Sequence, residues 1–329
     1  MASAVAVKYG CKFEIIDLHR EYWDNVVKYT MNKVSRGYTP NPDVMCNTII
    51  KFGAFYDKIG YKYDYIATGH YATRVGYATG KCKDAPDWVT PNHFLPSEVE
   101  WWICPAKDPI KDQVDFIANI DTKKVPISKI IFPIGNLMKE EVRKIAEENH
   151  LINAKRKDSQ GICFLGKINY NDYIKQYLGE KEGEIIDFDT CTCIGKHNGY
   201  WFHTIGQRKG LGLSGGPWYV IGKDIVKNIV FVSKDKNIKD TYTIPLNNIN
   251  WLTRNLIEDH KKSGNTEPNI CKVTFKIRHS PEHYTGTLMY LDDFCYIDCD
   301  EPITVAPGQF CILYDKDYYH CYGCGEISI

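Results

Sequence analysis

Cys46 lies in a setting that favours thiol chemistry. It follows the run YTPNPD over residues 38–43, in which two prolines stiffen the chain and Asp43 can cap a helix. In the first turn of that helix, unpaired backbone N–H groups and the helix dipole would favour the nucleophilic thiolate. The alternative is a small buried apolar residue, which composition alone favours because free cysteine is among the most buried residue types.

Cys163 is the second candidate nucleophile. It lies in KRKDSQGICFLG, residues 155–166, after three basic residues. Nearby cations lower a thiol pKa, and loops hold functional residues more often than cores do. A cysteine packed between Ile162 and Phe164 is the alternative. Because the chain has 13 cysteines, local setting alone does not select this pair.

Two glycine motifs could bind ligands. Thr68-Gly69-His70 ends a predicted buried strand over residues 63–67, at the edge where open α/β sheets bind ligands, and Gly69 would let a nucleotide approach the backbone. A tight turn with a hydrogen-bonded histidine fits equally well. The run over residues 210–215 matches G-x-G-x-x-G, but Pro217 and a strand-like segment follow where a helix should begin. We interpret it as a glycine-rich loop.

Two cysteine pairs invite a zinc or thiol-disulfide interpretation. Cys191 and Cys193 form C-x-C, and Cys321 and Cys324 form C-x-x-C. Neither pair is accompanied by a second C-x-x-C at the spacing of zinc fingers. The spacing therefore gives metal binding little support.

The elements that must position these residues differ between the two halves of the chain. Over residues 1–150, strands at 13–18, 63–67 and 130–134 alternate with helices from Asp43 and over 137–150, the second with Asn136 as N-cap, which predicts a parallel α/β sheet. Residues 76–105 have no clear period and are typical of an insertion or long loop. Beyond residue 180 we expect strands at 200–205, 218–221, 229–232, 273–277, 286–290 and 310–314, with a linker over 255–269.

Composition excludes several classes of protein. Apolar residues make up 43% and charged residues 25%, as in ordinary globular proteins, and no apolar run is long enough to span a bilayer. The start lacks a secretory signal, so we expect mostly reduced thiols in an intracellular protein, with cytoplasm or an organelle such as the mitochondrion left open. Residues 291–329 have a net charge of −7 and the rest +7, which permits a phosphate-rich partner.

Five motifs, in this order, resemble the tRNA-specific 2-thiouridylase family. They are TPNPDxxCN (39–47), ATGHYA (67–72), KDQ (111–113), DSxGICF (158–164) and TIGQRKGLG (204–212). The resemblance implies an α/β parallel-sheet nucleotide-binding domain of the PP-loop, or adenine nucleotide alpha hydrolase-like, type over residues 1–178. It also implies a small β-rich domain over 179–260 and a C-terminal β-barrel over 261–329.

The same resemblance implies a reaction. ATP, with Mg²⁺, adenylates the carbonyl oxygen at carbon 2 of the wobble uridine in tRNA, and a persulfide then delivers sulfur from a donor protein. Cys163 corresponds to the cysteine that holds the persulfide, and Cys46 to the nucleophile that releases the sulfur, the two ending as a disulfide. The base is expected to be flipped out, because its reacting carbon is inaccessible within a stack.

Other residues match binding positions of the family. By resemblance, Asn41, Pro42 and Asp43 contact the target base, and Gly69 contacts ATP. The expected tRNA contacts are His70, Lys111, Asp112, Gln113, Arg278, His279 and Gln309.

Two departures from the family pattern leave alternatives open. The PP-loop run Ser-Gly-Gly-x-Asp-Ser-Ser is absent, so we expect a nucleotide-binding domain truncated at its N-terminus. Either an active enzyme's gene model is incomplete, or the chain is a tRNA-binding protein that cannot use ATP. In addition, the family continues Lys-Asp-Gln with Ser or Thr, Tyr, Phe and Leu, where this chain has Val114, Asp115, Phe116 and Ile117.

Overall fold

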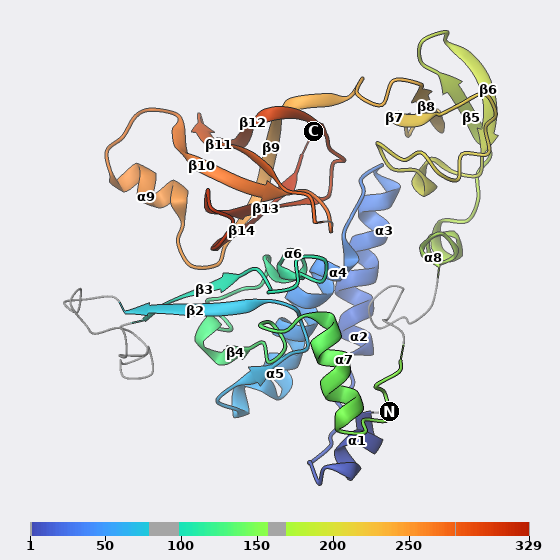
Figure 1. Ribbon diagram of the computed structural model, residues 1–329. Helices are drawn as coiled ribbons and strands as arrows, with labels where there is room; N and C mark the ends of the chain where they lie inside the picture. The colour runs from blue at the N-terminus through green and yellow to red at the C-terminus, as the bar shows by residue number, and fades with distance from the viewer. Residues whose placement is uncertain (1, 79–98, 157–168, 280, 329) are drawn as a thin grey trace.

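Short helices make up most of the N-terminal part of the computed structural model, which describes residues 2–78, 99–156, 169–279 and 281–328 (Figure 1). The helices in the first 62 residues are α1 (Ala2–Lys8), α2 (His19–Tyr22), a π-helical segment (Trp23–Val27), α3 (Lys28–Ser35), α4 (Pro42–Met45), a second π-helical segment (Cys46–Ala54), α5 (Phe55–Lys58) and a 3₁₀ turn (Gly60–Lys62). The helix expected from Asp43 is therefore present, and it continues without a break from Pro42 to Lys58.

The parallel pairing expected in this part consists of two short strands. β1 (Ile66–Ala67) pairs in parallel with β4 (Ile130–Ile131). The strands expected at 63–67 and 130–134 are thus present but shorter. The strand expected over residues 13–18 is wrong, since these residues form no ladder with any strand of the described ranges. A strand needs a neighbour that accepts its backbone hydrogen bonds, which an apolar run alone cannot supply.

The later helices of the N-terminal part are α6 (Val114–Ile117), a 3₁₀ turn (Ile127–Lys129), α7 (Lys139–Glu148) and α8 (Tyr170–Leu178). The start of α7 differs from expectation, because its N-cap is Met138 and not Asn136. Two carboxylates replace a capping side chain: Glu141 accepts from the Met138 backbone N–H at 2.6 Å, and Asp108 from that of Lys139 at 2.9 Å.

A hairpin of β2 (Thr73–Ala78) and β3 (Val99–Cys104) leaves the N-terminal part and joins the C-terminal sheet. The link is the antiparallel pair Cys321 and Ile103. The expectation of a loop without period over 76–105 is thus wrong at both ends, while residues 79–98 lie outside the described ranges.

The central domain is a four-stranded sheet of order β6-β5-β8-β7. Its strands are β5 (Gly183–Asp187), β6 (Thr192–His197), β7 (Tyr219–Asp224) and β8 (Ile229–Ser233). The strand expected over 200–205 is wrong, because Tyr200–Phe202 is a 3₁₀ turn. The glycine-rich segment is a loop, as expected, with positive φ at Gly210, Gly212 and Gly215.

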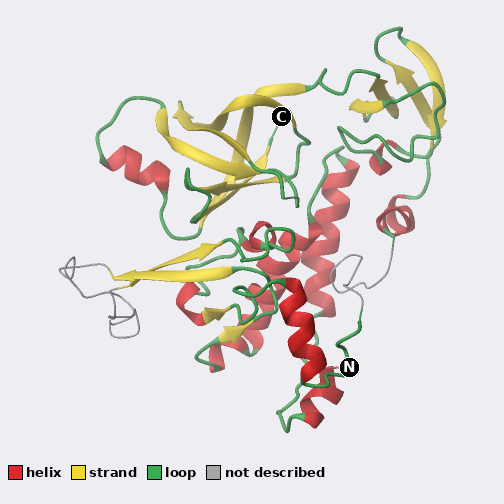
Figure 2. Cartoon of the chain, viewed as in Figure 1, coloured by secondary structure: helices red, strands yellow, loops and turns green. Residues whose placement is uncertain are grey.

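Six strands of the C-terminal part close into a barrel of order β13-β10-β11-β12-β9-β14, with β13 also paired to β14 (Figures 1 and 2). They are β9 (Asp240–Trp251), β10 (Asn269–Lys276), β11 (Tyr284–Leu291), β12 (Phe294–Thr304), β13 (Phe310–Tyr314) and β14 (Cys321–Ile327). In β12, Cys295, Ile297 and Cys299 alternate inward, the period-two pattern of a strand with one buried face.

Two expectations for this part need correction. The expected domain boundary between residues 260 and 261 would separate β9 from the other five strands of the barrel, to whose sheet β9 belongs. The segment 255–269 is not a bare linker, since it contains α9 (Leu256–Lys262), which Asn255 caps by accepting from the backbone N–H groups of Ile257 and Glu258.

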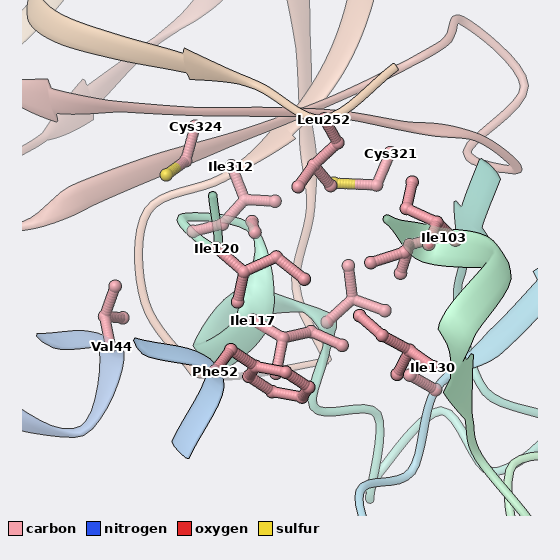
Figure 3. Packing of buried hydrophobic residues seen from close by; sticks show 14 of the residues in the cluster. Val44, Phe52, Ile103, Ile117, Ile120, Ile130, Leu252, Ile312, Cys321 and Cys324 are labelled. Atoms are coloured by element: carbon pink, nitrogen blue, oxygen red, sulfur yellow. The ribbon is translucent and has the colours of Figure 1, made fainter. Parts of the chain in front are cut away.

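One apolar cluster joins the N-terminal part to the barrel (Figure 3). Val44 and Phe52 from the long helix, Ile117 and Ile120 around α6, and Ile130 of β4 lie in the same cluster as residues of the barrel side, which include Leu252, Ile312, Tyr314, Cys321 and Cys324. Burying apolar surface across this boundary stabilises one arrangement of the two parts, at about 25 cal/mol per Å².

Candidate functional site

The expected base-binding segment begins the long helix, and Asn41 is its cap. The Asn41 side-chain oxygen accepts from the backbone N–H groups of Asp43 and Val44 at 3.1 and 3.2 Å. Pro42 occupies the first helical position, where its missing N–H costs nothing. The expectation that Asp43 caps the helix is therefore wrong. The cap fixes the direction in which Asn41, Pro42 and Asp43 leave the preceding loop.

Cys46 lies in the second turn of this helix and is fully buried. It is packed in an apolar cluster with residues of α2, the π-helical segment Trp23–Val27, α3 and α8, among them Tyr22, Val26 and Ile174. Of the two interpretations of Cys46, this surrounding is the one expected of a buried apolar residue. Cys163 lies outside the described residues.

Gly69 and His70 follow β1 but face different surroundings. Gly69 is exposed, and a Cβ there would meet no atom of the described residues within 4 Å, so these residues leave space for a ligand beside it. The His70 ring is 8% exposed, packs beside Phe52 and shares a 2.9 Å hydrogen bond with the Thr68 hydroxyl. Burial, helped by the charge of Lys51, lowers the pKa of His70 to about 3, so the ring is neutral.

The expected triplet at 111–113 faces inward for the most part. Asp112 is buried, accepts from the Ala106 backbone N–H at 3.0 Å and pairs with the buried Lys276 of β10 at 3.5 Å. Burial raises the pKa of Asp112, although the Ala106 hydrogen bond and Lys276 act against that rise. The Gln113 side chain accepts from the Tyr71 backbone N–H at 3.1 Å. This segment thus ties the N-terminal part to the barrel.

Arg278 and Gln309 come together in a cavity of about 470 Å³ between the central domain and the barrel. The central domain contributes Thr204 and Gln207 from the motif over 204–212. Arg278 is exposed and lies 3.6 Å from Glu282. His279 is not among the residues that line this cavity, and it contacts α6 instead.

Two further cavities adjoin this one through shared residues. A cavity of about 260 Å³ also contains Thr204 and Gln207 and is lined by Tyr38 and Thr39. The third, of about 510 Å³, shares Gln207 and contains the glycine loop and Lys209. Thr39 is the junction: its hydroxyl lies 3.3 Å from that of Thr204, and its backbone N–H donates to Pro307 at 2.8 Å.

Sequence reasoning missed several cavity-lining residues, including Tyr38, Asn171, Trp201 and His203. Tyr38 precedes a quoted motif and His203 precedes another, so their adjacency was the available signal. Burial and the neighbouring His197 and Lys223 lower the pKa of His203 to about 4, which keeps this ring neutral. Asn171 and Trp201 lie in no motif.

The zinc interpretation does not fit the surroundings of the cysteine pairs. Cys321 and Cys324 lie in the apolar cluster of Figure 3, and burial raises the pKa of both thiols. Among the residues whose positions are described, no group of three or more His, Cys, Asp or Glu side chains could hold a metal ion. The same described ranges contain no helix that is both long and apolar enough to cross a membrane.

Comparison with family models first defines the class: a nucleotide-binding domain, a small barrel-like domain and a β-barrel in one chain. Residues 1–167 match the "tRNA methyl transferase HUP domain", 171–234 the "tRNA methyl transferase PRC-barrel domain", and 242–327 the "Aminomethyltransferase beta-barrel domain". The expected fold class is confirmed. The expected truncation is not shown, since the first match begins at residue 1.

Curated relatives then give the family. Proteins called "tRNA-specific 2-thiouridylase MnmA" from Porphyromonas gingivalis and Parabacteroides distasonis are each 50% identical to this chain, over 100% and 99% of it and 85% and 84% of their own length. One called "tRNA-specific 2-thiouridylase MnmA 1" from Bacteroides thetaiotaomicron is 46% identical over 100% of the chain and 85% of the relative. The chain belongs to the tRNA-specific 2-thiouridylase family, as its motifs indicated.

Membership confirms the expected class of activity, which is ATP-dependent sulfur transfer to tRNA. It gives no support to a disulfide between Cys46 and Cys163, and it does not test the individual site residues.

Proposed function

We propose that this chain replaces the oxygen at carbon 2 of the wobble uridine in tRNA with sulfur. The observation that carries the proposal is the 50% identity to 2-thiouridylases over the whole chain. Three adjoining cavities between the domains support a substrate that touches all of them, because residues of two of the five motifs, those at 39–47 and 204–212, line these cavities. We further propose that a separate protein supplies the sulfur inside the cell, where ATP is available.

In the proposed reaction, adenylation makes the uridine oxygen a leaving group. The terminal sulfur of a Cys163 persulfide attacks carbon 2 and displaces AMP, and the Cys46 thiolate then attacks the Cys163 sulfur. The S–S bond of the persulfide breaks, the sulfur stays on the base, and a Cys46–Cys163 disulfide forms. Because Cys46 is fully buried here, its thiol must become accessible for that attack.

The proposed binding roles come from the resemblance to the family. We propose that the base lies against Asn41, Pro42 and Asp43, and that Arg278 and Gln309 contact tRNA at the 470 Å³ cavity. Lys111 is a further tRNA contact in this proposal. His70, Asp112 and Gln113 hold inward hydrogen bonds, so their part in tRNA binding is to fix the backbone around the exposed Gly69 and the half-buried Lys111.

ATP is assigned to Gly69, beside which space is open. For Mg²⁺, the described ranges contain no group of three or more His, Cys, Asp or Glu side chains that could hold the ion. We therefore assign no step to the ion.

The test is mass spectrometry of 2-thiouridine in tRNA incubated with this chain and glutathione persulfide, which passes its outer sulfur to the Cys163 thiol and leaves as glutathione, with or without ATP. We expect ATP-dependent product that is lost in Cys46→Ser and Cys163→Ser. Cys191→Ser, an exposed cysteine of the central domain, is the matched control and should be fully active. Product from Cys163→Ser would refute the assigned roles. Bound tRNA without product from the unchanged chain would favour a binding protein that cannot use ATP.

A further inference from the structure

Asp115 departs from the family pattern, and the structure shows what it contacts. The family has Tyr at the second position after Lys-Asp-Gln. This chain has Asp115 at that position, and it lies in α6. The Asp115 carboxylate is 4% exposed. Its Oδ2 lies 2.9 Å from Nδ1 of His279, a residue 164 positions later in the chain. A carboxylate introduced into a buried position has therefore found a basic partner across the domain boundary.

The His279 ring contacts Phe116 with its face, in addition to the hydrogen bond that its Nδ1 makes with Asp115. The His279 ring lies over Phe116, with ring centroids 4.8 Å apart at an angle of 38°. The His279 side chain is nevertheless 44% exposed. Since Nδ1 is directed to Asp115, the exposed edge of the ring carries Nε2. The arrangement fixes the orientation of the ring and leaves one nitrogen for an outside partner.

The charge of the ring depends on the groups that face it. Asp115 in α6 and Asp112 before it favour the charged imidazolium, whereas Lys276 of β10 opposes it. Arg278 and Glu282 flank the ring in sequence, and they pair with each other at 3.6 Å. The hydrogen bond to Asp115 has the largest effect, and together these groups raise the pKa of His279 despite its partial burial.

The protonation state decides what His279 offers to a ligand. With Nδ1–H donated to Asp115, a neutral ring presents Nε2 as a hydrogen-bond acceptor, which would repel a phosphate oxygen. The imidazolium presents Nε2–H as a charged donor, and charged donors make the stronger bonds to phosphate. Arg278, next in the chain, adds a second cation at the same surface.

We propose that Asp115 is a positioning residue that holds His279 as a charged hydrogen-bond donor, which together with Arg278 binds a backbone phosphate of tRNA. This role presupposes tRNA binding by the chain, as proposed above. Asp115 itself does not touch the nucleic acid. Its Oδ1 is buried and has no hydrogen-bond partner among the described residues, so the bond to His279 is its main stabilising contact there.

The first measurement is an NMR titration of the chain labelled with ¹³C-histidine, with the His279 signal assigned by its loss in His279→Gln. In the unchanged protein, we expect this ring to titrate above about 6.5, the ordinary histidine value. In Asp115→Asn it should titrate at or below that value, because burial then acts without the carboxylate. Equal titration midpoints in the two proteins would overturn the role.

The second measurement is the affinity for an unmodified tRNA transcript with a wobble uridine, from pH 5.5 to 8.5. At pH 7.5 we expect Asp115→Asn to weaken binding about tenfold, and the loss to shrink below about twofold at pH 5.5, where both rings are protonated. His279→Gln should weaken binding similarly at pH 7.5, and adding Asp115→Asn to it should change nothing further. In either variant, the slope of log affinity against log salt concentration should become less steep by the amount that corresponds to about one phosphate contact.

Asp57→Asn is the matched control, because the exposed Asp57 pairs with Lys124 at 2.5 Å on another surface. It should leave both the titration and the affinity unchanged. If Asp115→Asn weakens binding equally with or without His279, Asp115 has a merely structural role and the inference is wrong. If the unchanged chain binds no tRNA at any pH, the proposed function fails. If the chain binds tRNA with an affinity that changes neither with pH nor with Asp115→Asn, only the role of Asp115 is overturned.

Discussion

At the scale of the residue, His70 shows how burial decides what a motif side chain can do. Its ring lies under the surface beside the exposed Gly69 and shares a hydrogen bond with Thr68. Because burial lowers its pKa to about 3, the ring stays neutral while an unfolded chain would take up a proton near pH 6.5. Between those two values the unfolded state binds more protons, so the stability of the fold falls as pH falls.

The corresponding prediction concerns His70→Asn, which retains a short polar side chain but does not titrate. The variant should be less stable than the unchanged chain at pH 7, and the difference in unfolding free energy should shrink by about 2 kcal/mol between pH 6.5 and 5. Urea denaturation at each pH measures it. For the control His150→Asn, at an exposed histidine, the difference in unfolding free energy from the unchanged chain should not shrink comparably over this pH range. A constant difference for His70→Asn would mean that the ring takes up a proton in the fold as readily as in the unfolded chain.

At the scale of the element, the residue that caps the helix beginning at Pro42 has two functions. Asn41 caps the helix through its side-chain oxygen, and it is also a proposed contact of the target base. The two functions use different atoms, because an amide that accepts backbone hydrogen bonds with its oxygen still has an NH₂ group to donate. Substitutions can therefore separate them.

We expect Asn41→Ala to lower the unfolding free energy by about 1 kcal/mol, because two backbone N–H groups lose their acceptor. Asn41→Asp keeps an acceptor at the cap and should stay within about 0.5 kcal/mol of the unchanged chain. Its thiolation rate should still fall at least about tenfold, since the donor is gone and a negative charge replaces it. Unfolding curves and single-turnover thiolation give the two readouts. Full activity of Asn41→Asp would remove Asn41 from the base site.

Elements with strong local patterns were predictable, and elements that depend on distant partners were not. The strands at 229–232 and 310–314 were expected from their apolar runs, and β8 and β13 occupy those positions. The hairpin of β2 and β3 was missed, because its place in the barrel sheet depends on Cys321, more than 200 residues away. Likewise, the motif at 111–113 could not show that Asp112 pairs with Lys276, which lies more than 160 residues later in the chain.

At the scale of the whole molecule, contacts between domains orient the three parts of the site. The Tyr200 hydroxyl donates to the Ser35 carbonyl at 2.5 Å, and Lys33 forms a partly buried ion pair with Glu326. Between the N-terminal part and the barrel, the ion pair of Asp112 and Lys276 lies beside the shared apolar cluster, with both side chains 1% exposed. This pair favours the arrangement of the two parts in which the charges meet, since either charge alone is costly to bury.

Asp112→Asn should therefore destabilise the chain by about 3–5 kcal/mol, because it keeps the side chain's shape but leaves the Lys276 charge buried without a counter-charge. Adding Lys276→Met should recover much of that loss, since the double variant has no charge to bury, and the two effects should be strongly non-additive. Urea denaturation measures both. Asp57→Asn, which breaks an exposed pair, should cost less than about 1 kcal/mol. If the double variant were as unstable as the sum of its parts, Asp112 would stabilise the boundary through its hydrogen bond to Ala106 and not through Lys276.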